Sequence, residues 1–153
     1  GDDLLAMGEA ERVARCVQIK ADVVAGDERE GGRRALLNYG HTLAHALEIE
    51  TNHALAHGEA VGIGLVYAAH LAHHLGRISA DRVQQHYEVV GGAYELDTAL
   101  PDGLSPTRLV ALMARDKKVL GDQLTFVLDG TQGVEVVAGV TAEAALAALA
   151  SMR

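Results

Sequence analysis

The sequence has no tryptophan, one phenylalanine and one cysteine among its 153 residues. Cys16 cannot form a disulfide within the chain, so a reducing, cytoplasmic location is expected. Because large aromatic side chains are scarce, alanine, leucine, valine and isoleucine have to build the core, and these residues pack closely in helices. The composition therefore predicts a helical domain.

Positive charge is also scarce, since 13 Lys and Arg residues face 21 Asp and Glu residues, for a formal net charge of −8. This balance argues against nucleic acid or an anionic membrane as the main partner, although a local basic pocket could still bind a small anion. The longest apolar run, residues 60–72, is too short and too polar for a membrane span. The N-terminus lacks the pattern of a signal peptide. We expect a globular protein that binds neither nucleic acid nor a membrane.

Helical spacing of apolar residues predicts six helices, of which the third is apolar on nearly every side and hence central. The predicted helices span residues 6–25, 34–51, 59–76, 79–94, 104–119 and 141–152. Ser79, Ser105 and Thr141 are expected N-caps. Residues 124–140 read as two short strands joined by turns, which is typical of a hairpin. The predicted fold is mainly α: a helical bundle with one small β-hairpin, as a single domain over residues 1–153.

Two histidines four residues apart, His41 and His45, are the first candidates for a functional site. Such a pair projects from one helical face, as two metal ligands or a ligand beside an acid–base group would. Arg34 and Asn38 extend the stripe at steps of four and three residues. A guanidinium, an amide and two imidazoles suit an anionic, oxygen-rich ligand. The alternative is that these histidines are simply solvated or hydrogen-bonded.

The remaining polar candidates are ambiguous when taken alone. His57 precedes a predicted helix and could be an ordinary loop histidine. Two imidazoles bind zinc, but a catalytic zinc ion usually has three protein ligands, and none of the glutamates has a compelling spacing. Lys117 and Lys118 lie at a predicted helix end, where the helix dipole favours cations, although either could hold a phosphate. Lys20 reads as a solvated lysine.

Three stretches together resemble one known family. RALLNYGHTLAHALE (34–48), HGEAVGIGL (57–65) and RDKK (115–118) resemble the C-terminal domain of 3-dehydroquinate synthase and the related sugar phosphate cyclases. The match extends over about residues 12–128 and is far more specific than a histidine pair. It implies the C-terminal half of a two-domain enzyme, whose N-terminal NAD-binding domain is absent from this chain.

The resemblance also implies roles for the matching residues. The implied ligands of a divalent metal, zinc or cobalt, are His41 and His57. The implied catalytic residues are Arg34, Asn38 and His45, with His45 near the substrate phosphate and able to assist proton transfer. The implied substrate-binding residues are Lys20, Arg34, Asn38, His45, Lys117 and Lys118. No residue of this chain is assigned to NAD.

The implied reaction converts DAHP, a seven-carbon keto acid phosphate, into 3-dehydroquinate and phosphate in the shikimate pathway of aromatic amino acid biosynthesis. The full-length enzyme is expected to be a homodimer that binds a small anionic sugar phosphate, and this chain alone is expected to be inactive. The family's third metal ligand, a glutamate, lies upstream of the match, and Ala44 replaces a glycine of many synthases.

Two alternatives to this function remain: another sugar phosphate cyclase of secondary metabolism, and a non-catalytic helical module. The glycerol dehydrogenases fit less well, because the Arg34–Asn38 stripe suits a charged substrate.

Overall fold

The structure, a computed structural model, describes residues 3–26, 32–115 and 123–152. The chain divides into two compact units, Gly1–Leu37 and Asn38–Arg153. The first unit contains a 3₁₀ turn, Leu4–Ala6, and helix α1, Glu9–Ala25, which ends before Gly26 as predicted. All the side chains of α1 are at least partly exposed.

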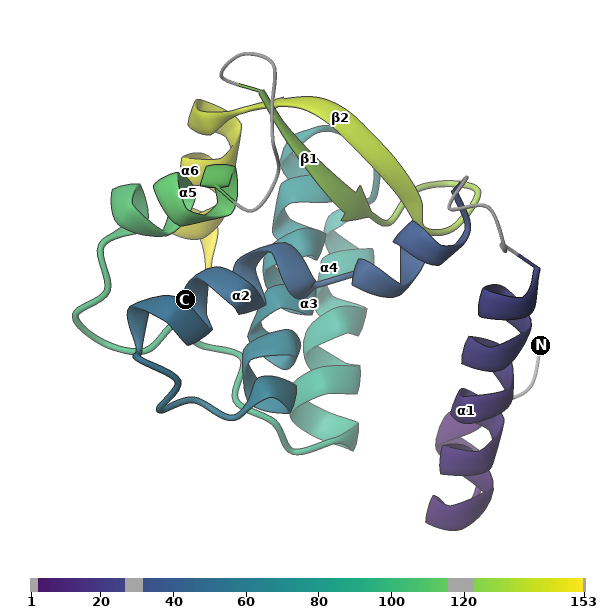
Figure 1. The fold of residues 1–153 in the computed structure, drawn as a ribbon. Coiled ribbons are helices and arrows are strands. Elements are labelled where there is room, and N and C mark those ends of the chain that lie inside the picture. Colours follow the sequence, from purple (N-terminus) through teal and green to yellow (C-terminus); the bar gives the residue numbers. More distant parts are fainter. Residues whose placement is uncertain (1–2, 27–31, 116–122, 153) are drawn as a thin grey trace. The chain divides into compact units, whose positions relative to one another are not determined.

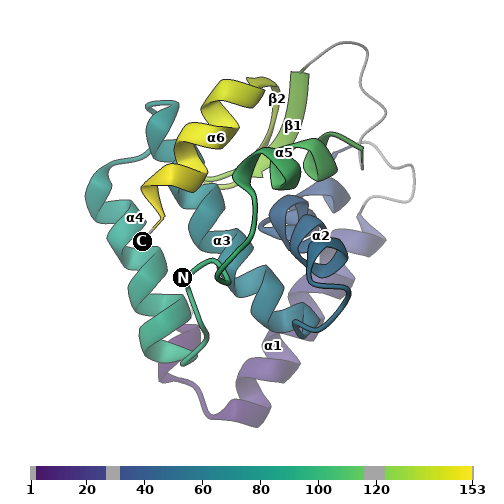
Figure 2. The ribbon, with the colours of Figure 1, turned by 90° about the vertical axis from the view of Figure 1, so that its left-hand side faces the viewer.

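The second unit is a group of helices covered at one end by a two-stranded sheet (Figures 1 and 2). In chain order its elements are α2 (His41–Glu50), α3 (His57–His74), α4 (Ala80–Tyr87), the π-helix Glu88–Ala93, α5 (Pro106–Arg115), β1 (Gln123–Leu128), β2 (Glu135–Thr141) and α6 (Ala142–Ser151). Helix α3 packs against α2, α4, α6 and β1, and so occupies the centre of this unit. The predicted fold class, mainly α with one hairpin, is confirmed.

Helix α3 is buried because it is rich in alanine and glycine, whose small side chains let neighbouring elements approach. Ten of its residues are buried, among them Ile63, Tyr67 and Leu71. The Tyr67 hydroxyl donates a hydrogen bond to the carbonyl of Ala145 in α6 at 3.2 Å. Burial raises the pKa of Tyr67 far above its ordinary value of 10.0, so this hydroxyl remains a donor at neutral pH.

The three predicted N-caps and the predicted hairpin agree with the structure. The hydroxyls of Ser79, Ser105 and Thr141 each accept a hydrogen bond from a first-turn backbone N–H. Strands β1 and β2 pair antiparallel, from Gln123 opposite Thr141 to Leu128 opposite Glu135, with an irregularity between Leu124 and Phe126. Among the helices that the structure describes, none combines the length and the apolar character needed to cross a bilayer.

The prediction of one continuous helix over residues 34–51 is wrong. A 3₁₀ helix ends at Asn38, Gly40 has a φ of +79°, and α2 begins only at His41. A left-handed residue interrupts the regular ladder of backbone hydrogen bonds, and glycine adopts this conformation without a steric penalty. The proposed stripe from Arg34 through Asn38 to His45 therefore does not lie along a single helix.

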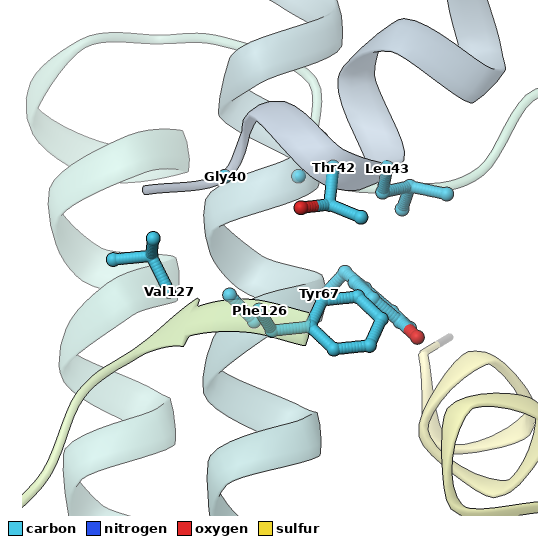
Figure 3. A pocket seen from close by; sticks show the side chains of 8 residues that line it. Gly40, Thr42, Leu43, Tyr67, Phe126 and Val127 are labelled. Atoms are coloured by element: carbon cyan, nitrogen blue, oxygen red, sulfur yellow. The ribbon is translucent and has the colours of Figure 1, made fainter. Parts of the chain in front are cut away.

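A small crevice lies where the start of α2 meets α3 and β1 (Figure 3). Its lining residues carry no formal charge: Gly40, Thr42, Leu43, Gly64, Tyr67, Ala68, Phe126 and Val127. The rings of Tyr67 and Phe126 pack at a centroid distance of 6.1 Å. This crevice belongs to the core, so the functional site has to be sought on the other side of α2.

Candidate functional site

Three histidines lie together where α2 and α3 begin. His41 is the first residue of α2, His45 follows one turn later, and His57 is the first residue of α3. The ring centroids of His41 and His45 are 5.8 Å apart, and those of His41 and His57 are 5.4 Å apart. The expectation that His41 and His45 share one helical face is therefore confirmed.

The turn between the two helices brings His57 to His41. Asn52 and His53 have φ values of 53° and 59°, and the N–H of His53 donates to the carbonyl of Glu48 at 2.7 Å. Left-handed residues after a helix reverse the direction of the chain. Helix α3 consequently starts beside α2, and a separation of sixteen residues in sequence becomes a ring-to-ring contact.

Hydrogen bonds determine which nitrogen carries the proton in two of these imidazoles. Nδ1 of His41 lies 3.0 Å from the carbonyl oxygen of Tyr39, and Nδ1 of His57 lies 2.9 Å from a carboxylate oxygen of Glu48. A carbonyl and an ionised carboxylate can only accept, so Nδ1 is the donor in both cases. In the neutral ring, Nε2 then presents its lone pair, which is the usual arrangement of a metal-binding histidine.

These residues fit two positions of a metal site. Two imidazoles that share a tetrahedral zinc ion through their nitrogens have ring centres about 5 Å apart, and His41 and His57 are 5.4 Å apart. Within the described ranges, no group of three histidine, cysteine, aspartate or glutamate side chains is arranged to hold a metal. The distance alone would also allow His45 as the second ligand, but the orienting carboxylate favours His57.

Glu48 is the residue at the site that sequence reasoning undervalued. It follows His41 by seven positions and His45 by three, so a helical stripe does contain it. Its partner, however, is on another helix, and no periodicity within α2 could reveal that contact. Glu59, in contrast, is the ordinary first-turn acid that was expected: its carboxylate accepts from the N–H of Ala56 at 3.1 Å.

Tyr39 borders the site on the N-terminal side of His41. Burial raises the pKa of Tyr39 well above its ordinary value of 10.0, and the nearby charge of Asp129 raises it further, whereas Arg82 acts in the opposite direction. The phenol therefore remains protonated at neutral pH. It can serve as a hydrogen-bond donor to a neighbouring side chain.

The residues predicted to bind substrate, other than His45, do not lie on the helix that carries the histidine pair. Asn38 is exposed at the end of the 3₁₀ helix, and Lys20 and Arg34 are exposed residues of the first unit. Lys117 and Lys118 lie outside the described residues. Ala44 has 0% relative exposure in the core, so replacing a glycine there affects helix packing and not the surface that carries the histidines.

A family model described as 3-dehydroquinate synthase C-terminal matches residues 4–119. The chain is 51% identical over 140 residues to a protein of Amycolatopsis mediterranei (strain S699) provisionally named an aminodehydroquinate synthase, over 92% of this chain and 39% of that protein. It is 47% identical over 131 residues to 3-dehydroquinate synthase of Rhizobium meliloti (strain 1021), over 81% of this chain and 34% of that enzyme. The chain thus spans well under half the length of these curated relatives.

Solved structures of similar fold come from sugar phosphate cyclases. A 2-deoxy-scyllo-inosose synthase, complexed with carbaglucose-6-phosphate, NAD⁺ and Co²⁺, matches with a TM-score of 0.82 at 20% identity, over 100% of this chain and 47% of that one. A 2-epi-5-epi-valiolone synthase from Streptomyces hygroscopicus subsp. jinggangensis 5008, with NAD⁺ and Zn²⁺ bound, matches with a TM-score of 0.77 at 26% identity, over 96% of this chain and 41% of that one. The sequence match and the shared fold agree: the chain belongs to the family of 3-dehydroquinate synthase C-terminal domains.

Proposed function

We propose that this chain is the C-terminal, metal- and substrate-binding part of a two-domain 3-dehydroquinate synthase. The parent enzyme would be a lyase that converts DAHP into 3-dehydroquinate and phosphate, in the cytoplasm, as a step of aromatic amino acid biosynthesis. The observation that carries the proposal is the pair His41 and His57, 5.4 Å apart, with each Nδ1 bonded to an acceptor. Relatives named 3-dehydroquinate synthase at 41–47% identity support the same reaction.

The parent would bind NAD and a divalent metal, since the two solved structures of similar fold contain NAD⁺ with Co²⁺ or Zn²⁺. The chemistry that these groups would supply is polarisation of a substrate oxygen by the metal and transient hydride transfer by NAD. In this chain, His41 and His57 would present Nε2 to the metal, and the remaining ligand and most of the NAD site would come from the rest of the parent. The carboxylate of Glu48 holds the His57 ring in the orientation that this role requires.

The remaining residues would handle a small anionic substrate. The imidazole of His45 can both donate and accept a proton, so it would assist proton transfer at the phosphate end. Arg34 offers a planar fork of donors to a carboxylate or phosphate, and Asn38 offers an amide to a hydroxyl. Lys20, Lys117 and Lys118 would add positive charge toward the same anion. An anionic substrate would give these cationic and amide side chains a common role, although the chain as a whole has a net charge of −8.

A second candidate is the formation of aminodehydroquinate, the activity named for the relative that is 51% identical to this chain. The reacting groups would be the same, and the substrate would be an amino-substituted analogue of DAHP. The discriminating measurement is kcat/KM of the full-length parent for DAHP and for this analogue, followed as phosphate release with NAD and zinc present. A preference for DAHP supports the first candidate, and the reverse preference replaces it by the second.

Site variants of the parent test the assignment of residues. We expect His45→Ala to lower kcat/KM at least about 100-fold, because general acid–base groups contribute factors of this size. Arg34→Ala should also lower kcat/KM, because a substrate anion loses its two-pronged donor. The melting temperature should change little in either variant. His74→Ala, an exposed position of α3, is the matched control and should keep normal activity. Near-normal kcat/KM in both site variants would remove Arg34 and His45 from the mechanism.

The chain by itself tests the two-domain proposal. Phosphate release from DAHP by the 153-residue chain alone, with NAD and zinc added, would contradict that proposal.

A further inference from the structure

One residue bonds two different histidines, one through its backbone and one through its side chain. The carbonyl oxygen of Tyr39 accepts from Nδ1 of His41 at 3.0 Å, and the Tyr39 hydroxyl lies 2.8 Å from Nε2 of His86. His86 belongs to α4, a helix separate from the two that carry the three histidines of the site. Tyr39 thus connects the first histidine of α2 with a helix on the opposite side of α3.

The direction of the second bond follows from the partners of His86. Its Nδ1 lies 2.8 Å from the carbonyl oxygen of Arg82, which can only accept, so Nδ1 carries the proton. In the neutral ring Nε2 is then an acceptor, and the Tyr39 hydroxyl donates to it. The two rings meet edge to face, with centroids 6.1 Å apart.

His86 is itself held in place. The side chain of Arg82 donates through Nε to a carboxylate oxygen of Asp129 at 2.7 Å, and the Asp129 side chain is only 3% exposed. Asp129 directly follows β1, so this ion pair attaches α4 to the hairpin. A series of bonds therefore runs from the end of β1 through α4 to Tyr39.

We propose that Tyr39 is a positioning residue: its hydrogen bond to His86 fixes the carbonyl that orients the imidazole of His41 for metal binding. The inference rests on the proposed function, in which His41 is a metal ligand. Gly40 allows the chain to turn between Tyr39 and His41, and a rotation of the Tyr39 peptide would move the acceptor away from Nδ1. The phenol–imidazole bond opposes that rotation from outside the site.

The chain contains a matched control for this hydrogen bond. Tyr87 and His70 form a second tyrosine–histidine pair, 2.9 Å apart, between α4 and α3. That pair also connects α4 to the rest of the unit, but neither of its residues lies next to His41 in the sequence. If tyrosine–histidine bonds contribute only to stability, removing either hydroxyl should have the same consequences.

The test is a zinc titration of the 153-residue chain, corrected for the folded fraction by circular dichroism. We expect Tyr39→Phe and His86→Phe each to weaken zinc binding about tenfold, the lower end of the range for partners that orient a ligand. The double variant should bind zinc no more weakly than the single variant with the lower affinity, because the two substitutions remove the same hydrogen bond. His86→Gln, which keeps an acceptor, should restore part of the affinity, and Tyr87→Phe should leave it unchanged. Equal losses in Tyr39→Phe and Tyr87→Phe, or no loss in Tyr39→Phe, would overturn the proposal.

Nitrogen-15 NMR of the imidazoles separates this inference from the proposed function. We expect the Nδ1–H tautomer of His41 to predominate in the metal-free wild type and to lose population in Tyr39→Phe. If His41→Ala does not weaken zinc binding, the metal assignment fails, and the tautomer shift still decides whether Tyr39 orients His41. If His41→Ala abolishes binding but Tyr39→Phe changes neither the affinity nor the tautomer, only the positioning role is wrong.

Discussion

The carbonyl oxygen of Gly40 occupies the place where a side chain on Gly64 would begin: a Cβ added at Gly64 would lie 2.0 Å from it. A Cβ on Gly40 would in turn lie 3.0 Å from the backbone nitrogen of Leu65. The start of α2 and the middle of α3 therefore touch through their backbones. Because His41 directly follows Gly40, this contact holds the first residue of α2 close to α3.

Gly64→Ala should destabilise the chain because the backbone of α2 or α3 has to shift. Overpacking of this kind costs about 1–3 kcal/mol, and the atom that the new Cβ would meet is the backbone carbonyl oxygen of Gly40, which cannot rotate away as a side chain could. Gly58→Ala in the same helix has nothing within 4 Å of the added Cβ and should be neutral or slightly stabilising. Urea denaturation of both variants checks the difference. Equal stability would show that α2 and α3 are not in backbone contact.

Glu48→Ala should weaken zinc binding to the chain by about 10–100-fold, the usual effect of removing a carboxylate that orients a metal-binding histidine. Without the bond to Nδ1, the His57 ring can rotate and exchange tautomers. Glu50→Ala is the control, since Glu50 is on the same helix but bonds the guanidinium of Arg108. Calorimetry with zinc compares the two variants. If Glu50→Ala weakens binding as much as Glu48→Ala does, the orienting role of Glu48 is wrong.

Asp129→Ala should lower the free energy of unfolding by about 2 kcal/mol. The buried carboxylate accepts from Nε of Arg82 and from the backbone N–H of Gly130, and alanine leaves that N–H without its acceptor. Glu135→Ala removes the exposed partner of Arg77 and should cost well under about 1 kcal/mol. Chemical denaturation monitored by circular dichroism measures both. A loss as small as that of Glu135→Ala would contradict the role of Asp129 in attaching α4 to the hairpin.

Stability should fall as the pH is lowered below 6.5, in part through His70. Burial lowers the pKa of His70 from its ordinary value of 6.5, and the neighbouring charge of His73 lowers it further. The unfolded chain then binds this proton more readily, so the stabilising effect of neutral His70 is complete above pH 6.5 and is lost as the pH falls toward the folded pKa.

His70→Gln should give a flatter dependence of unfolding free energy on pH, because glutamine keeps a hydrogen-bonding group near Tyr87 but does not titrate. Urea denaturation between about pH 5 and about pH 7.5 spans the ordinary histidine range. His74→Gln on the exposed face of the same helix is the control and should leave the slope closer to that of the wild type. An unchanged slope in His70→Gln would assign the pH dependence to other groups.

Local sequence determined the features whose causes lie within a few residues. Ser79, Ser105 and Thr141 cap helices because a hydroxyl reaches an N–H two or three residues ahead, whatever the rest of the chain does. The apolar character of residues 59–76 on nearly every side predicted the central helix, and the turn residues after Leu128 predicted the hairpin. The ordered motif around His41 and His57 was specific enough to identify the family.

Tertiary structure alone decided how these elements make a site. The apolar spacing favoured one helix from Arg34 onward, but Gly40 takes a left-handed conformation there and its backbone packs against Gly64. Periodicity within one segment does not show which other helix its backbone will meet. The bonds from Glu48 to His57 and from Tyr39 to His86 likewise join different helices. Their existence depends on the turn geometry and on which helix faces meet. The sequence thus identified the histidines as candidates, and the packing of α2 against α3 brought the imidazole of His57 to its partner Glu48 and to His41.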